Sequence, residues 1–583
     1  MKALFSKTKL VRGWRLAIGL FSLGLTSVLI TYPVKAAEEI TLSYGFMQYS
    51  VSINALESYA KTGEVTATLL PYIHQIPPDQ FAPLRQLLLT PIPLDAQQVA
   101  QLLQTPLGQK LVNRLSRLIQ PGQSQSSQLN PSVIQAAFVR AATNPDGFTL
   151  LDVLHQFPDA QIKVDISQAL RVITAAKTLV KQTNDAIVQV KSQAQKEASA
   201  QPLPDVPLAE LHQSGYFNWE QQTLTLTDQE RNRTVPVDLY LPLVQRPHPV
   251  IVISHGLSSD RSSFAYLAKH LASHGFAVVV PEHPGSSWQQ LLALFDHKSD
   301  RINHPQEFAD RSLDISYILD ELGTLAQSHP DLYKRLNLKQ VGVMGQSFGG
   351  YTALTLAGAD SQFERLKMAC QQEQTSLNLS LMLQCQALAL SQENYELSDP
   401  RVHAVMAISP IGSGLLGQAS MSQINVPTLI VASSADALAP AVVEQIQPFS
   451  WLTASRKYLA LIHGGTHFSS VGSSVGQTSE SLSSLWGTDT AIVHDYITTL
   501  STAFFQTHLA NHSGHRPYLT AAYAKTISQD TLPLSLVQSF TYLPLNQASS
   551  GFNLSNPLII IGISTQVIGL LYYIAHHRSK LQD

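Results

Sequence analysis

The chain has 583 residues, of which 44% are hydrophobic and 14% are charged. This length allows several domains with a large buried core, and the low charged fraction excludes a chain dominated by disordered charged tails. Since the formal net charge is only −3, no basic field indicates nucleic acid as a partner.

Residues 1–36 have the pattern of a secretory signal peptide. Five lysines and arginines precede an apolar run from Leu16 to Ile30. Val34 and Ala36 then supply the −3 and −1 positions of a cleavage site before Ala37. An uncleaved anchor is the alternative. In both cases the rest of the chain crosses a membrane, so we expect the protein in the periplasm or cell envelope.

The signals over residues 37–200 are mainly helical. Ser52 can cap a helix that ends at Gly63, and a long helical stretch runs from Ile166 to about Ala198. We therefore predict an all-α domain, whose apolar stripes form its core rather than a lipid-binding or cofactor-binding surface. One such stripe consists of Leu107, Leu111, Leu115 and Leu118.

A proline-rich linker over residues 201–211 separates this part from a region of different character. Over residues 212–530, short apolar runs alternate with helical segments, which predicts an α/β domain with a mostly parallel sheet covered on both faces. The first two runs should form a hairpin around residues 228–233. The expected strands are Thr223–Thr227, Thr234–Tyr240, Val250–Ile253, Phe276–Val280, Val341–Met344, Val402–Ile408, Thr428–Ala432 and Tyr458–Leu461.

Gly345-Gln346-Ser347-Phe348-Gly349 has the G-x-S-x-G pattern, between an expected strand and an expected helix. In this context the serine occupies a strained turn from which its Oγ projects beyond the sheet. The flanking glycines let neighbouring backbone pass close to that turn. Ser347 is therefore the predicted nucleophile, and a glycine-rich turn without catalysis is the alternative.

A serine hydroxyl is a weak nucleophile, so it needs a histidine base that a carboxylate orients. When the nucleophile is on such an elbow, the acid and then the base follow it along the chain. Asp436 lies in the segment Ser433-Ser434-Ala435-Asp436 that follows the expected strand Thr428–Ala432, and it is the predicted acid, with Glu444 as the competitor. His467 follows the last expected strand and a Gly-Gly turn, and it is the predicted base, with His463 as the alternative.

When a serine hydroxyl attacks a carbonyl group, the carbonyl oxygen becomes an oxyanion, which backbone N–H donors must stabilise. We predict that Phe348, which follows the nucleophile, and Leu257, in the loop after an early strand, supply them. His255 in the same loop is interpreted as a structural residue. This chemistry requires no cofactor and no metal, and no Cys/His spacing resembles a metal site.

Residues 359–400 separate the helix after Ser347 from the next expected strand. Because this segment is far longer than a connection of about 4–6 residues, we predict a helical cap that shapes the acyl pocket. It holds the chain's two cysteines, Cys370 and Cys385. They can pair in an oxidising compartment, and two buried free thiols are the alternative.

The C-terminal part is predicted to be an extension over residues 531–556, followed by a candidate transmembrane helix over residues 557–575. The latter carries no charged residue, and Arg578 and Lys580 follow it. Its length barely matches a bilayer core of about 30 Å. A helix packed on the α/β domain or lying flat on lipid is the alternative.

Residues 250–287 and the segment from Gly345 to Gly350 resemble platelet-activating-factor acetylhydrolases and related dienelactone-hydrolase-like esterases. The resemblance covers roughly residues 212–510 and implies an α/β-hydrolase fold. It also implies Ser347 as nucleophile, His467 as base, and Leu257 and Phe348 as oxyanion donors. The helical part resembles a domain of unknown function that precedes such hydrolases in photosynthetic bacteria.

One departure concerns the acid. In the acetylhydrolases it follows the sixth strand, where this chain has Ile408-Ser409-Pro410 without a carboxylate. Asp436 matches the arrangement of the dienelactone hydrolases. We therefore predict a serine hydrolase that cleaves small-molecule or lipid carboxylic esters through an acyl-enzyme. The alternatives are a lipase or phospholipase acting on envelope lipids, with membrane association, and a non-catalytic envelope-binding protein.

Overall fold

The computed structural model describes most of the chain between residues 37 and 543. The predicted signal peptide, residues 1–36, and the candidate membrane span, residues 557–575, lie outside the described residues. Within the described part, no helix has both the length and the hydropathy needed to cross a bilayer. The described residues are 37–44, 47–67, 69–70, 85, 88–92, 94–121, 130–144, 147–158, 161–203, 208–329, 334–371, 376–390, 395–472 and 489–543.

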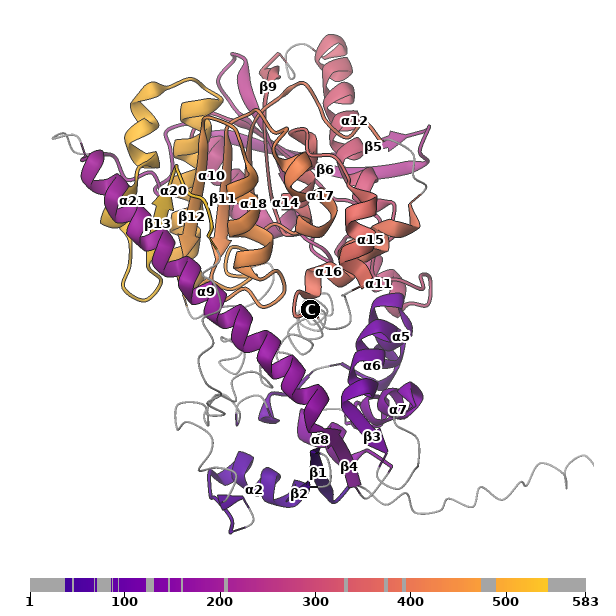
Figure 1. Ribbon diagram of the computed structural model, residues 1–583. Helices are drawn as coiled ribbons and strands as arrows, with labels where there is room; N and C mark the ends of the chain where they lie inside the picture. The colour runs from indigo at the N-terminus through magenta and orange to yellow at the C-terminus, as the bar shows by residue number, and fades with distance from the viewer. Residues whose placement is uncertain are drawn as a thin grey trace, which may run out of the picture.

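A nine-stranded sheet in the order β13-β12-β11-β10-β9-β7-β8-β6-β5 forms the centre of the fold (Figure 1). Every pairing among β7 to β12 is parallel, whereas β5, β6 and β13 join the sheet in antiparallel pairs. This is the predicted α/β-hydrolase architecture. The strands are β5 (Trp219–Asp228), β6 (Arg233–Pro242), β7 (His248–Ser254), β8 (Ala277–Pro281), β9 (Leu336–Gln346), β10 (Val402–Ile408), β11 (Thr428–Ser433), β12 (Lys457–Ile462) and β13 (Leu534–Val537).

Alternate residues of the central strands face two different cores. Ile251 and Ile253 of β7 belong to the core that contains α10 and α20, while Val250 and Val252 belong to the core that contains α12. This alternation follows from the period of two along a strand, and helices on both faces exclude water from the sheet. The helices are α10 (Ala265–Ser273), α12 (Glu307–Ser328) and α20 (Thr490–His508).

All eight expected strands lie in this sheet, as β5 to β12, and the expected hairpin joins β5 to β6 with Asp228 paired to Arg233. The ninth strand, β13, lies in the segment that the sequence presents as a C-terminal extension. It pairs antiparallel with β12, with Leu534 opposite Ile462. A four-residue strand carries too little periodicity to be distinguished without its partner.

The N-terminal region is largely helical, as predicted, but the prediction of an all-α domain is corrected by a second sheet. Its four strands have the order β2-β1-β4-β3. β1 pairs with β4, which lies about 120 residues later in the chain. Short strands that depend on such distant partners leave no strong local pattern. They are β1 (Glu39–Tyr44), β2 (Met47–Ser52), β3 (Ile119–Pro121) and β4 (Gln161–Asp165).

Local sequence signals explain where the N-terminal helices begin. The side chain of Ser52 caps α2, and Gly63 ends this helix with a φ of +80°. The side chain of Thr105 accepts a hydrogen bond from the N–H of Gly108 at the start of α6, where proline occupies the first position. The helices are α2 (Ile53–Thr62), α5 (Ala96–Gln104), α6 (Pro106–Leu118), α7 (Pro131–Ala141) and α8 (Leu150–His155).

A 35-residue helix, α9 (Ile166–Ala200), connects the two parts. At 1.5 Å per residue it is about 50 Å long. Figure 1 shows it running from the small sheet to the edge of the large sheet at β13. There the carboxylate of Glu197 accepts hydrogen bonds from the backbone N–H groups of Gln538 and Ser539. The N-terminal region is thus attached to the hydrolase at the far edge of its sheet.

The segment 359–400 contains the helices α15 (Phe363–Gln371) and α16 (Leu379–Gln384) and the 3-10 helix η3 (Cys385–Ala389). A disulfide joins Cys370, near the end of α15, to Cys385, the first residue of η3. We call this segment the cap. It contacts α17 (Ser413–Met421) on the hydrolase side and α6 on the N-terminal side.

Candidate active site

Ser347 stands at the junction between β9 and α14 (Phe348–Leu356) with a φ of +57° and a ψ of −115°. A non-glycine residue adopts such a conformation only where the surroundings enforce it. Gly345 and Gly349 make the turn sterically feasible. A Cβ at Gly349 would lie 1.9 Å from the carbonyl oxygen of Ser254, and one at Gly345 would lie 2.4 Å from the backbone of Gly349. The turn therefore has the geometry of a nucleophile elbow.

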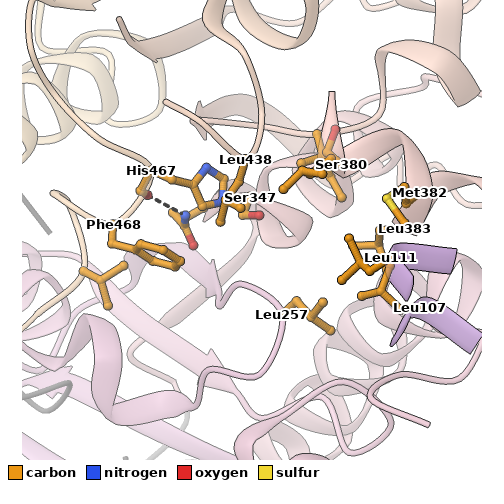
Figure 2. A pocket seen from close by; sticks show the side chains of 14 residues that line it. Leu107, Leu111, Leu257, Ser347, Ser380, Met382, Leu383, Leu438, His467 and Phe468 are labelled. Carbon is orange, nitrogen blue, oxygen red and sulfur yellow. Dashed lines mark hydrogen bonds between the residues drawn. The ribbon is translucent and has the colours of Figure 1, made fainter. Parts of the chain in front are cut away.

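His467 and Asp436 meet at the carboxyl ends of β11 and β12. The Nδ1 of His467 donates to Oδ2 of Asp436 at 2.7 Å, and both side chains are buried. Because Nδ1 carries this proton, Nε2 is the ring nitrogen left to accept one in neutral imidazole. His467 and Ser347 line the same pocket, and Figure 2 shows the histidine ring beside the serine.

The carboxylate of Asp436 is held from several sides. Its Oδ1 accepts from the backbone N–H groups of Leu438 at 3.0 Å and Ala439 at 2.7 Å. Its Oδ2 accepts from Nε2 of Gln445 at 2.9 Å in addition to His467. Four donors converge on the two oxygens, which fixes the orientation of the carboxylate.

Two glutamines of the site were missed by sequence reasoning. Gln445 positions Asp436, and Gln346 donates from Nε2 to the backbone carbonyl of His467 at 3.0 Å, the bond marked by the dashed line in Figure 2. Gln346 is the variable residue of the G-x-S-x-G pattern, so the motif gives no signal for it. Gln445 lies nine residues after Asp436, in the π-helical turn η4 (Val442–Ile446). A π-turn at this position is the kind of irregularity that is frequent at functional sites.

In the structure, His463 does not occupy the position of the predicted base, and Glu444 does not occupy the position of the predicted acid. Nε2 of His463 lies 2.9 Å from Oγ of Ser535 on β13, and burial lowers the pKa of His463 to about 4. Glu444 points toward the cap instead of His467. Its carboxylate accepts hydrogen bonds from the Asn378 and Gln384 side chains and from the backbone N–H groups of Gly412 and Ser413.

The two predicted oxyanion donors, Leu257 and Phe348, belong to different elements of the fold. Leu257 lines the pocket with Ser347, and Phe348 is the first residue of α14, where a backbone N–H has no partner within the helix. Both N–H groups therefore come from the elements in which oxyanion donors occur in this fold.

His255 fixes the conformation of the loop that carries Leu257. Its Nε2 accepts from the backbone N–H of His283 at 3.0 Å, so Nδ1 is the protonated nitrogen and donates to the carbonyl of Gly256 at 2.7 Å. Burial and the nearby Arg311 lower the pKa of His255 well below its ordinary value. It is a neutral structural residue, as the sequence interpretation has it.

A buried cluster of charged and polar side chains packs against the loop that carries Leu257. Oγ of Ser254 lies 3.0 Å from Nε2 of His283, whose Nδ1 donates to Asp314 at 3.1 Å. Burial lowers the pKa of His283 to about 4. The guanidinium of Arg311 lies 4.5 Å from the ring centroid of Phe348, and burial lowers its pKa to about 10. The loop that carries Leu257 and the first residue of α14 thus contact the same buried polar cluster.

The pocket above Ser347 has a volume of about 90 Å³ and is lined almost entirely by apolar side chains. Figure 2 shows two of them, Leu107 and Leu111, next to Met382 and Leu383. This corrects the interpretation of the α6 stripe as core alone, because Leu107 and Leu111 also face the pocket. The lining residues are Leu107, Leu111, Leu257, Gln346, Ser347, Leu379, Ser380, Met382, Leu383, Ile411, Leu438, His467, Phe468 and Val471.

Among the residues that the structure describes, no group of three or more His, Cys, Asp and Glu side chains is arranged to hold a metal ion. The polar groups at the pocket are those of Gln346, Ser347, Ser380 and His467. Their arrangement fits nucleophilic attack by a serine hydroxyl.

Two protein families match separate parts of the chain. Residues 36–165 match a family described as an alpha/beta hydrolase of unknown function (DUF1400), and residues 208–371 match the chlorophyllase family. The first match covers the N-terminal region as far as the start of α9, and the sequence analysis finds that this region resembles a domain of unknown function. The second includes the nucleophile elbow and the loop that carries Leu257.

The chain is also similar to several curated esterases. Cutinase 2 of Thermobifida cellulosilytica is 25% identical over 238 residues, which are 40% of this chain and 64% of the cutinase. Cutinase cut1 of Thermobifida fusca has the same identity over 40% of this chain and 53% of its own length. Platelet-activating factor acetylhydrolase of Canis lupus familiaris is 26% identical over 162 residues, 22% of this chain and 36% of the enzyme.

This chain therefore spans between about a third and two thirds of the length of these relatives. It has the α/β-hydrolase fold, with an N-terminal region similar to the DUF1400 family and a domain similar to chlorophyllases, and it is distantly related to cutinases and platelet-activating factor acetylhydrolases. The recognition of an acetylhydrolase-like α/β hydrolase from the sequence is confirmed.

Proposed function

We propose that this protein hydrolyses carboxylic esters through an acyl-enzyme formed on Ser347. The observation that carries the proposal is the orientation of His467 by Asp436 at 2.7 Å, in the same pocket as a serine on a strained elbow. A hydroxyl, an oriented base and an apolar pocket are the requirements for acyl transfer from an ester. The similarity to esterases of three kinds supports the same reaction class.

The reaction proceeds in two halves. Nε2 of His467 takes the proton of Ser347 while Oγ attacks the ester carbonyl carbon, and the N–H groups of Leu257 and Phe348 stabilise the oxyanion. Collapse of the intermediate breaks the bond to the alcohol, which leaves with the proton from His467. Water then attacks the acyl-enzyme after giving a proton to His467. The carboxylic acid is released and Ser347 regains its proton.

A lipase or phospholipase that acts on envelope lipids is the second candidate. The apolar lining of the pocket favours it, because an acyl chain gains more than a polar group from such a surface. The disulfide of the cap supports the proposal of export, since disulfides persist in oxidising compartments. Assays with phospholipid vesicles beside p-nitrophenyl esters separate this candidate from an esterase of small molecules.

The test is labelling and turnover with a Ser347→Ala variant. The unaltered protein should react with a fluorophosphonate probe and hydrolyse p-nitrophenyl butyrate. The variant should lose the label and lower kcat/KM by about 10⁴-fold or more, because the covalent step is deleted. Its circular dichroism spectrum should stay unchanged.

Ser422→Ala is the matched control, since the Ser422 hydroxyl bonds to the carbonyl of Ala419 on α17 and does not line the pocket. It should keep full activity and labelling. Unaltered protein that neither labels nor turns over any ester in the series would instead favour the non-catalytic binding protein.

A further inference from the structure

We propose that the N-terminal helical region supplies one wall of the acyl pocket, and that Leu107 and Leu111 of α6 set the length of the acyl chain. The inference rests on the proposed ester hydrolysis and extends it to a substrate class, esters of apolar acids with medium or long chains. It also assigns a role to a region that contains no catalytic residue of the proposed triad.

The wall consists of two leucines on one face of α6. Leu107 and Leu111 are four residues apart, so their side chains lie one turn from each other. Both line the pocket that contains Ser347 and His467. Leu107 is 8% exposed and Leu111 is half-buried. Figure 2 shows them beside Met382 and Leu383 of the cap, so α6 and α16 together close this end of the pocket.

A polar contact attaches α6 to the cap next to this wall. The guanidinium of Arg114 contacts Sδ of Met382 at 3.3 Å and donates to the backbone carbonyl of Ser376. Met382 is itself a pocket residue. The position of Leu111 is therefore coupled to the position of the cap, and the two cannot move apart without breaking these contacts.

The corner between α5 and α6 fixes the direction in which α6 approaches the pocket. Thr105 ends α5 and caps α6, and a Cβ at Gly108 would lie 2.0 Å from the backbone oxygen of Leu102. Only glycine permits this close approach. α5 is in turn docked on the hydrolase helix α11 (Trp288–Phe295), because Gln101 donates from its amide to the carbonyl of Phe295 at 3.2 Å.

The acyl chain bonded to Ser347 is the part of the substrate that this wall must accommodate. In the acyl-enzyme the acyl group is bonded to Oγ of Ser347, and the surface around that atom is apolar up to Leu107 and Leu111. A short acyl group does not reach α6, whereas a longer one must lie against it. A pocket that adds or loses space for one methylene changes discrimination by about 10-fold or more.

The experiment measures kcat/KM for p-nitrophenyl acetate, butyrate, octanoate and dodecanoate with the full chain. Leu107→Trp and Leu111→Trp fill the pocket, and each should lower the ratio of dodecanoate to acetate hydrolysis at least 10-fold. Leu111→Ala should shift the preference toward longer chains. Acetates of longer alcohols should respond to none of these changes.

Leu115→Trp is the matched control, because Leu115 lies one turn further along α6, is half-buried and does not line the pocket. It should keep the chain-length profile of the unaltered protein. Thermal unfolding of every variant identifies those that fold, and Leu111→Ala tests the proposal if a tryptophan does not fit.

An unchanged ratio of dodecanoate to acetate hydrolysis in folded Leu107 and Leu111 variants would overturn this inference, as would an effect limited to the alcohol series. Failure of the proposed function looks different, because the unaltered protein would then hydrolyse no ester of the series and leave Ser347 unlabelled.

Discussion

Asp436 depends on neighbours that no motif contains. Two backbone N–H groups hold Oδ1, and Gln445 and His467 hold Oδ2. Gln445 also donates to the carbonyl of Ala439 at 2.8 Å, and its Oε1 accepts from the N–H of Ser433 at 2.8 Å. One buried amide thus connects the end of β11, the following loop and the predicted acid, which makes Gln445 a positioning residue.

Replacing Gln445 with alanine should therefore lower kcat about tenfold and leave KM almost unchanged, because the base loses orientation while the pocket lining stays intact. The N–H of Ser433 would lose its partner, which should also cost about 1–3 kcal/mol of stability. Steady-state kinetics and thermal unfolding measure the two effects. Gln447→Ala, at the start of α18 (Gln447–Trp451), is the control, and equal losses in both variants would contradict the assignment.

At the scale of elements, an internal disulfide cross-links the cap, and polar contacts attach the cap to the rest of the α/β domain. The disulfide closes a segment of 15 residues between α15 and η3. Glu444 of η4 binds Asn378 and Gln384 of the cap together with two backbone N–H groups at the start of α17. Because α16 lines the pocket from between these attachments, the stability of the cap and the shape of the pocket are linked.

The double variant Cys370→Ser/Cys385→Ser should be less stable than the unaltered chain by up to about 3 kcal/mol, the entropy that a 15-residue loop regains when its link is removed. A looser α16 should raise KM for dodecanoate more than for acetate. Thermal unfolding and ester kinetics, each with and without reductant, measure this. A reductant effect that persists in the double variant would show that the disulfide is not its cause.

At the scale of the whole molecule, folding buries several histidines in neutral form. Burial lowers the pKa of His270 to about 3, and those of His283 and His508 to about 4. In the unfolded chain these groups titrate near 6.5. Below that pH the unfolded state therefore binds more protons than the folded state, and the free energy of unfolding falls as the pH decreases toward the folded pKa values.

We accordingly expect the protein to lose stability steadily between pH 6.5 and pH 4. His270→Leu removes one such proton-binding group, so the slope of unfolding free energy against pH should decrease by about 1.4 kcal/mol per pH unit between pH 4 and pH 5.5. Its stability at pH 7 should fall because the contact of His270 with Thr502 is lost. Denaturant titrations across this range provide the slopes, and the exposed His403, changed to glutamine, should leave the slope unaltered.

The sequence by itself determined the parts of the protein that depend on neighbouring residues. Apolar runs of strand length predicted β5 to β12, because each strand was long enough to show its burial pattern. The elbow at Ser347 was predictable because its glycines, strand and helix are adjacent in the chain. Asp436 and His467 followed from the order of acid and base after that elbow.

Only the tertiary structure decided what depends on distant pairings. β13 and the N-terminal sheet needed strands from elsewhere in the chain, and Gln445 acquired its role from a π-turn that no local pattern predicts. The sequence predicted that the stripe on α6 is part of the core, because a leucine that faces a protein interior and one that faces a pocket have the same periodicity. Whether Leu107 and Leu111 face the protein interior or the pocket depends on α16, which lies more than 260 residues away in the sequence. The contact between α6 and α16 is made only in the folded chain.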